Sequence, residues 1–155
     1  MLANEHDLKE EDIDAITVTI SPFMDGLVGG KFVAGSNPQV AAQFSVQYSI
    51  ACAIQRRELG IAEIQPDVIA DPAINTLVKK IKVIVEPNWP GKFAPCDLEI
   101  HARDGRRLTH HAAHTPGTLE NPMSMSDLKA KFSDCAASGV SPMNEGQRNT
   151  AIETM

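Results

Sequence analysis

Two segments of alternating residues, joined by Asp104-Gly105, restrict the fold more than any other feature of the chain. Before the turn, residues 98–102 alternate between apolar and charged or polar side chains, which is the period of a strand with one buried face. An Asp-Gly pair favours the two-residue turn of a β-hairpin, because both residues readily adopt a left-handed backbone. We therefore predict that residues 106–112 form a second strand, antiparallel to the first.

Further strands and helices are predicted before this hairpin. Residues 13–20 alternate between apolar and polar side chains, and residues 81–85 (IKVIV) form a short apolar strand. The longest helical segment covers residues 38–59, and we expect Gly60 to stop it. Its apolar residues cover most of the circumference, so we expect this helix to be buried on several sides. A shorter helix is predicted to start at Asp71-Pro72, a cap followed by a proline that suits the first turn.

The remaining segments are a glycine-rich stretch and the C-terminal part. Residues 26–38 contain too many glycines for regular structure, so we predict a flexible loop there. Ser126 is predicted to cap a helix, and a last helix is expected from about Asn144. The element order predicts an α+β fold: a small, mainly antiparallel sheet with a long buried helix packed on it, plus C-terminal helices.

Composition limits the domain count, the partners and the compartment. The chain has 155 residues, 43% hydrophobic and 22% charged, as expected for one folded domain. Its 20 acidic residues exceed its 14 basic ones and no basic stripe offsets the net charge of −6, so we expect no nucleic acid and no membrane as partners. Cys52, Cys96 and Cys135 form no CxxC pair, and we predict buried free thiols in a reducing cytoplasm.

Histidines at positions 110, 111 and 114 form a cluster of candidate metal ligands. On a strand His111 points away from His110, and no cysteine or carboxylate stands at ligand spacing, so we expect a solvated edge strand and no metal. A metal site at His110 and His114 is the remote alternative.

The segment Gly29-Gly30-Lys31 is similar to the end of a phosphate-binding loop. That loop requires the spacing GxxxxGK followed by Ser or Thr. Here Asp25 replaces the leading glycine and Phe32 replaces the hydroxyl residue, so we do not expect phosphate binding at this loop.

Ser45, Gln47 and Tyr48 are polar residues within the otherwise apolar long helix. A buried hydroxyl or amide costs roughly 1–3 kcal/mol if it is left unpaired, so these groups need partners. Ser45 and Tyr48 are three residues apart and share a helix face, so the two hydroxyls could point into a cleft. In the alternative, Tyr48 bonds a core carbonyl and Ser45 bonds its own helix backbone. The residues alone leave both arrangements open.

Residues 42–54 (AQFSVQYSIACAI) resemble the FSxxY helix of the MmgE/PrpD family. Further motifs of that family follow in the same order along the chain: Asp71-Pro72-Ala73-Ile74, Lys80-Ile81-Lys82-Val83, the Asp104-Gly105 hairpin, Asn121-Pro122-Met123-Ser124 and Asp127-Leu128. Each motif is weak alone, but several at the right spacing make a chance similarity improbable. The resemblance covers nearly the whole chain, from about Ile13 onward.

The resemblance implies proton chemistry on small di- or tricarboxylates, with no metal and no organic cofactor, as in 2-methylcitrate dehydratase. Members of the family place the active site between a large helical domain and a smaller lid domain, and commonly form homodimers. The resemblance assigns residues 1–120 to a lid-type α/β domain, and residues 121–155 to a helical segment that returns to the helical domain. At the matching positions it implies that Tyr48 is catalytic, as a donor of a hydrogen bond or proton, and that Ser45 and Gln47 bind substrate.

Two functions follow as expectations. In the first, the chain is the lid part of a lyase or isomerase and is active only when a helical-domain partner chain supplies the acid/base residues. In the second, it is a non-catalytic domain that self-associates or binds a partner, because the faces that would meet a helical domain are otherwise exposed apolar patches.

Overall fold

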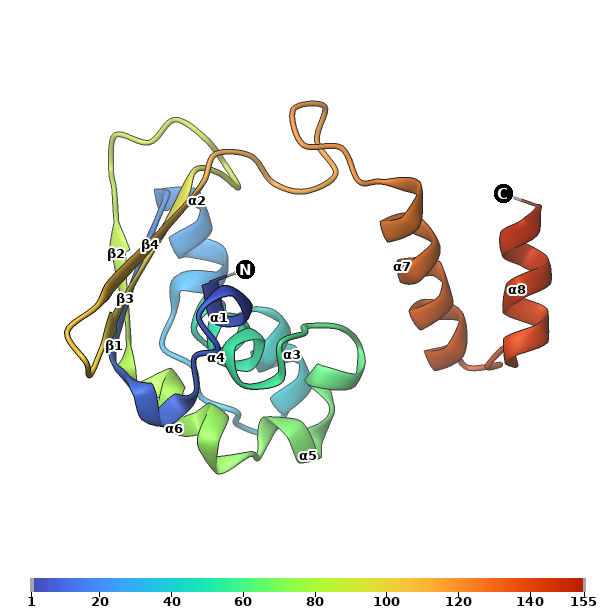
Figure 1. Ribbon diagram of the computed structural model, residues 1–155, viewed down its shortest axis with the longest axis horizontal. Helices are drawn as coiled ribbons and strands as arrows, with labels where there is room; N and C mark the ends of the chain where they lie inside the picture. Colours follow the sequence, from blue (N-terminus) through green and yellow to red (C-terminus); the bar gives the residue numbers. More distant parts are fainter. Residues whose placement is uncertain (1, 155) are drawn as a thin grey trace. The chain divides into compact units, whose positions relative to one another are not determined.

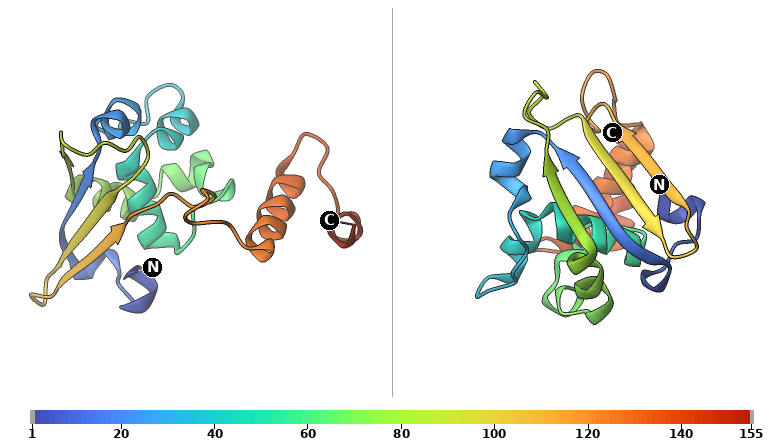
Figure 2. Two further views of the ribbon diagram at one scale, coloured as in Figure 1. Left: turned by 90° about the horizontal axis from the view of Figure 1, so that it is seen from above. Right: turned by 90° about the vertical axis from the view of Figure 1, so that its left-hand side faces the viewer.

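The computed structural model describes residues 2–154, which form two compact units with the boundary between Thr115 and Pro116 (Figure 1). The first unit contains a four-stranded sheet in the order β2-β1-β3-β4 (Figure 2). Its strands are β1 (Ile13–Ile20), β2 (Ile81–Val85), β3 (Cys96–Ala102) and β4 (Arg107–Ala112). Strand β1 pairs parallel with β2 and antiparallel with β3, and β3 pairs antiparallel with β4. The predicted α+β fold with a mainly antiparallel sheet is confirmed.

The hairpin forms as its sequence predicts. Ile100 on β3 pairs with Leu108 on β4, and Gly105 in the turn has a φ of +88°, a left-handed conformation that glycine adopts without strain. Asp104 stabilises the turn by accepting a hydrogen bond from the Arg106 N–H at 3.0 Å.

The prediction of one continuous helix over residues 38–59 is wrong, because the structure has two helices there. Helix α3 (Pro38–Gln43) ends before Phe44, and helix α4 (Val46–Arg56) starts after Ser45. Ser45 has an extended backbone, and its hydroxyl accepts a hydrogen bond from the Tyr48 N–H at 3.2 Å. A serine that caps a helix in this way competes with helix continuation, which explains the break.

The predicted stop at Gly60 is also wrong. Helix α4 ends at Arg56, and Arg57 takes the left-handed conformation with a φ of 65°. The Arg57 guanidinium donates hydrogen bonds to the backbone oxygens of Ala3 and Leu8. These bonds fix the N-terminal segment, including α1 (Leu2–Glu5), and explain why a non-glycine residue tolerates this backbone.

Short helices complete the first unit. The loop predicted over residues 26–38 begins with regular structure, since α2 (Pro22–Met24) continues into a π-helical turn, η2 (Asp25–Gly29). Helix α6 (Pro72–Lys80) is capped by Asp71 as predicted, through a 2.8 Å hydrogen bond from the Ala73 N–H. The others are η1 (Glu10–Asp12), η3 (Ala62–Ile64) and α5 (Pro66–Ile69).

The core of the first unit lies between one face of the sheet and helices α4 and α6 (Figure 1). Its fully buried large side chains come from the N-terminal segment, β1, both helices and β3: Leu8, Ile13, Ile16, Val18, Ile20, Tyr48, Cys52, Ile74, Leu77 and Ile100. The opposite face of the sheet carries ion pairs, among them Glu99 with Arg107.

The second unit contains two helices, α7 (Met125–Ser138) and α8 (Glu145–Glu153), and neither has a buried residue. Helix α7 starts after Ser124, two residues before the predicted cap, because Ser124 and Asp127 form a reciprocal capping box. The helix expected from about Asn144 is present as α8, and Asn144 is its cap. The division of the chain into a lid-type domain over residues 1–120 and a returning segment over residues 121–155 stays a prediction.

The prediction of three buried thiols is correct for one cysteine. Cys52 is buried, Cys96 is half-buried and Cys135 is exposed, and all three are free. Within residues 2–154, no helix has both the length and the apolar character needed to cross a membrane.

Candidate functional site

The three predicted site residues lie together at the start of α4, but their side chains go in different directions. Ser45 is 3% exposed, and its hydroxyl caps the helix. The Tyr48 side chain runs into the core, whereas Gln47 faces a cavity on the surface of the first unit. The break between α3 and α4 produces this arrangement, because it places Ser45 before the first helical turn rather than inside a helix.

Tyr48 is completely buried, and its hydroxyl donates a hydrogen bond to the backbone oxygen of Glu63 in η3. Burial raises the pKa of this hydroxyl, and the neighbouring Cys52 and Glu63 raise it further. The group therefore keeps its proton at neutral pH and acts as a hydrogen-bond donor. Of the two arrangements that the sequence left open, this chain has Tyr48 bonded to a core carbonyl and Ser45 bonded to its helix backbone. The catalytic role of Tyr48 and the substrate contact of Ser45 stay predictions.

The turn η3, whose Glu63 carbonyl accepts the Tyr48 hydrogen bond, is stabilised by the contacts of the Glu63 carboxylate. Glu63 is 5% exposed, its carboxylate accepts a hydrogen bond from the Gly60 N–H at 3.0 Å, and Arg56 lies 3.6 Å from the same carboxylate. A buried carboxylate requires such partners. The Arg56–Glu63 pair thereby fixes the position of the carbonyl that receives the Tyr48 hydroxyl.

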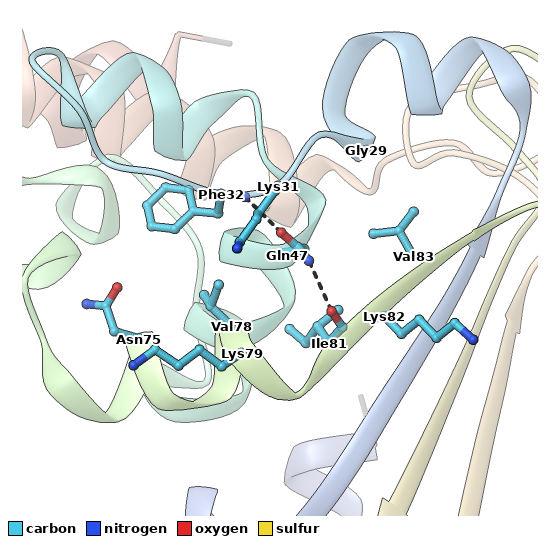
Figure 3. A pocket seen from close by; sticks show the side chains of 10 residues that line it. All are labelled: Gly29, Lys31, Phe32, Gln47, Asn75, Val78, Lys79, Ile81, Lys82 and Val83. Atoms are coloured by element: carbon cyan, nitrogen blue, oxygen red, sulfur yellow. Dashed lines mark hydrogen bonds between the residues drawn. The ribbon is translucent and has the colours of Figure 1, made fainter.

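Gln47 connects three separate segments through its side-chain amide. Its oxygen accepts a hydrogen bond from the Phe32 N–H at 2.8 Å, and its nitrogen donates to the Ile81 carbonyl at 3.0 Å (Figure 3). Both ends of the amide are therefore occupied by backbone groups. Through these two hydrogen bonds, Gln47 on helix α4 connects the loop after η2 to strand β2. Its predicted contact with substrate stays a prediction.

The cavity beside Gln47 has a volume of about 660 Å³ and is cationic. Its lining residues come from the loop after η2, from α4, from α6 and from β2: Gly29, Lys31, Phe32, Gln47, Asn75, Val78, Lys79, Ile81, Lys82 and Val83 (Figure 3). The Phe32 ring lines the cavity and packs against the Tyr48 ring, with the two ring centroids 5.2 Å apart. The cavity can hold an anion of small-molecule size.

Lys31 and Lys79 are the residues of this cavity that sequence reasoning missed. Lys31 was noted only as part of a phosphate loop with the wrong spacing, and Lys79 lies in the last turn of α6, where a lysine also suits the helix dipole. The two are 48 positions apart in the sequence, and only the packing of α6 beside the loop after η2 brings them to one cavity.

His110 and His111 lie on opposite faces of β4, as the strand pattern predicts, whereas His114 follows the end of this strand. His111 pairs with Asp97, whereas His110 lines an apolar pocket beside Leu98 and Ile100. Within residues 2–154, no group of three or more histidine, cysteine or acidic side chains is arranged to hold a metal ion.

Comparison with known proteins decides the family. A sequence profile of the MmgE/PrpD C-terminal domain matches residues 1–155, the whole chain. This chain belongs to the MmgE/PrpD family. The resemblance carried by the FSxxY segment and the motifs after it is thereby confirmed.

A relative within this family has a named activity. Cis-aconitate decarboxylase from Mus musculus is 26% identical to the MmgE/PrpD chain over 93 residues, which is 59% of this chain. The match spans 19% of the length of the mouse protein, about a fifth.

Proposed function

We propose that this chain is the lid-type part of a cofactor-independent MmgE/PrpD lyase or isomerase that acts on small di- or tricarboxylates. The observation that carries the proposal is the match of the whole chain to the MmgE/PrpD C-terminal domain. The similarity to a mouse cis-aconitate decarboxylase favours an unsaturated tricarboxylate among the candidate substrates. The acid/base residues come from a helical part, either elsewhere in the polypeptide or on a partner chain, and the assembly works in the cytoplasm.

Tyr48 is the proposed proton or hydrogen-bond donor to a substrate carboxylate or leaving hydroxyl. The raised pKa of its hydroxyl suits a donor and not a general base. The hydroxyl has to leave the Glu63 carbonyl to reach substrate, so η3 is the segment we expect to shift when the helical part binds. Ser45 is the proposed second contact, because its hydroxyl accepts from the Tyr48 N–H and keeps its own proton to donate.

The test is reconstitution of the two parts. The purified chain is mixed with a polypeptide that carries the helical part of an MmgE/PrpD enzyme, and loss of cis-aconitate by decarboxylation or hydration is followed. We expect activity only in the mixture, and a loss of kcat of at least about 100-fold in Tyr48→Phe. The control is Thr76→Ala, which removes an exposed hydroxyl on α6 and should keep full kcat. An active complex in which Tyr48→Phe keeps its kcat would remove Tyr48 from the proposed mechanism.

A second candidate function is self-association without catalysis. Leu119 and Val140 are fully exposed and Met125 is 56% exposed, all in the second unit, where such apolar side chains fit a protein partner. In this case the chain forms a homo-oligomer in solution. Sedimentation equilibrium decides the point: a monodisperse monomer across the accessible concentration range rules this candidate out.

A further inference from the structure

We propose that the Lys31–Lys79 cavity binds a small organic phosphate, with the phosphate held by the two lysines and the organic part lying against Phe32 and Val83. This inference goes beyond the proposed lyase or isomerase function and does not rest on it, because binding requires only residues of the first unit. It departs from the expectation that the loop around Lys31 does not bind phosphate, because that expectation concerned the backbone of a Walker-type loop, whereas here two lysine side chains hold the phosphate. A phosphate ligand is also chemically different from the carboxylate substrates proposed above.

The cavity is lined by positive charge, although the chain as a whole is negatively charged. The chain has a net charge of −6, yet the ten residues that line this cavity include three lysines and no acidic residue. Within the part of the chain that the structure describes, none of the three lysines forms an ion pair with a carboxylate. By comparison, Lys80 on the same helix is paired with Glu10. Lysines left unpaired around one cavity of an acidic protein attract an anion of small size.

Two of the lysines lie on the same side of the cavity. Lys31 extends from the loop toward Val78 on α6, and Lys79 extends along α6 toward Asn75, whereas Lys82 extends away along the sheet (Figure 3). The Asn75 nitrogen already donates to the backbone oxygens of Ile69 and Asp71, which fixes the orientation of this amide beside Lys79. We therefore assign Lys31 and Lys79 to the anion, with Lys82 outside the site.

The cations of the cavity are lysines, which bind phosphate as compact point charges, as in phosphate-binding loops. The planar fork of arginine pairs bidentately with carboxylates and with phosphates alike. None of the ten lining residues in Figure 3 is an arginine. Two point charges from separate segments suit a tetrahedral group with oxygens on several sides.

The rest of the cavity suits an organic body. Phe32, Val78, Ile81 and Val83 give it apolar walls, and a volume of about 660 Å³ lies within the range of small-molecule sites. The Gln47 amide holds the backbone of Phe32 and of Ile81, which makes the walls rigid before a ligand arrives. Binding therefore costs little reorganisation.

The Asp25 carboxylate lies beside Gly29, a residue that lines this cavity, and offers a further test of the proposal. It is close to Gly29, since a Cβ added to that glycine would overlap the Asp25 Oδ1. A negative charge there opposes an anion, so its removal should strengthen binding.

The experiment is calorimetric titration of the full 155-residue chain with phenyl phosphate, inorganic phosphate and tricarballylate at low ionic strength. We expect saturable binding of phenyl phosphate, weaker binding of inorganic phosphate and the weakest binding of tricarballylate. Replacing both lysines (Lys31→Gln with Lys79→Gln) should weaken phenyl phosphate binding about tenfold. Asp25→Asn should strengthen it about twofold, since one screened surface charge is removed.

Lys82→Gln is the matched control, because it removes a cation from the same wall without removing one from the proposed site. It should change the affinity less than about twofold. Circular dichroism of each variant checks that the fold is kept. The proposal is overturned by any of three results: no saturable binding of phenyl phosphate, equal weakening by Lys82→Gln and the double variant, or tighter binding of tricarballylate than of phenyl phosphate.

Discussion

Helices α4 and α7 start with the same kind of cap, but they differ in how deeply their residues are buried. Each is capped by a serine whose hydroxyl accepts a hydrogen bond from the N–H three residues later, at 3.2 Å for Ser45 and 3.1 Å for Ser124. Helix α4 then buries four residues, whereas α7, although longer, buries none. A cap starts a helix, but burial supplies most of the stability of helices in proteins. The first unit therefore has a buried core that stabilises its helices, whereas α7 and α8 bury no residue.

The largest expected difference between the two units comes from one substitution made in each. Leu77 on α6 is completely buried, whereas Leu128 on α7 is 42% exposed. Leu77→Ala should lower the free energy of unfolding by about 3 kcal/mol, through lost burial and a cavity. Leu128→Ala should lower it by less than about 0.5 kcal/mol. Urea unfolding followed by Trp89 fluorescence measures both.

Equal effects of the two leucine substitutions would contradict the comparison. A cost above about 2 kcal/mol at Leu128 would mean that α7 is buried in solution. Self-association would then account for the burial of Leu128, and the loss of unfolding free energy in Leu128→Ala should depend on protein concentration.

Tyr48→Phe is the next largest expected effect. The substitution keeps the buried ring but leaves the Glu63 carbonyl without its donor, which should lower the free energy of unfolding by about 2 kcal/mol. Urea unfolding again measures the change. Tyr48→Phe with unchanged stability would mean that the Glu63 carbonyl finds another donor, and that the Tyr48 hydroxyl is free to serve a substrate.

Alkaline pH tests the same region without a substitution. Burial raises the pKa of the Tyr48 hydroxyl and of the Cys52 and Cys96 thiols. Because these folded-state pKa values lie above the unfolded ones, the stability they contribute is fully present below about pH 8.5 and is lost as the pH rises above it. Unfolding midpoints measured from about pH 8 to 11 should fall, and less steeply in Tyr48→Phe. A flat profile would contradict the raised pKa values of all three groups.

Local patterns in the sequence predicted most of the first unit. The hairpin followed from Asp104-Gly105, and the strand over Ile13–Ile20 followed from its alternation, because both depend on neighbouring residues. The continuous helix over residues 38–59 failed because apolar spacing does not reveal that Ser45 leaves the helix to cap the next one. The predicted stop at Gly60 failed for a different reason: the helix ends just before Arg57, and the Ala3 and Leu8 carbonyls that Arg57 contacts come from a distant part of the chain.

The candidate site was less predictable than the fold. The polar cluster at Ser45, Gln47 and Tyr48 was visible because polar groups in an apolar helix need partners. Those partners, the Glu63 carbonyl and the backbones of Phe32 and Ile81, lie 15 to 34 positions away, so the sequence could not name them. The cationic cavity was missed for the same reason.

The two serine caps give a smaller and closely matched comparison. Ser45→Ala removes a cap that is almost completely buried, and should lower the free energy of unfolding by about 1.5 kcal/mol. Ser124→Ala removes an exposed cap with similar geometry, and should reduce helical content without moving the unfolding transition of the first unit. Urea unfolding and far-ultraviolet circular dichroism separate these outcomes. A shift of the transition by Ser124→Ala would link the two units energetically.

The smallest expected effect belongs to the largest change, removal of residues 116–155. All the buried core residues lie between Ala3 and Ala102, so the first unit keeps its core without this segment. Its free energy of unfolding should change by less than about 0.5 kcal/mol, as measured by urea unfolding with Trp89 fluorescence. Sedimentation of the shortened chain gives the second measurement. If the exposed apolar residues of the second unit mediate self-association, the shortened chain becomes a monomer with unchanged stability. A loss of stability together with the loss of association would instead mean that the first unit draws part of its stability from a partner that the second unit recruits.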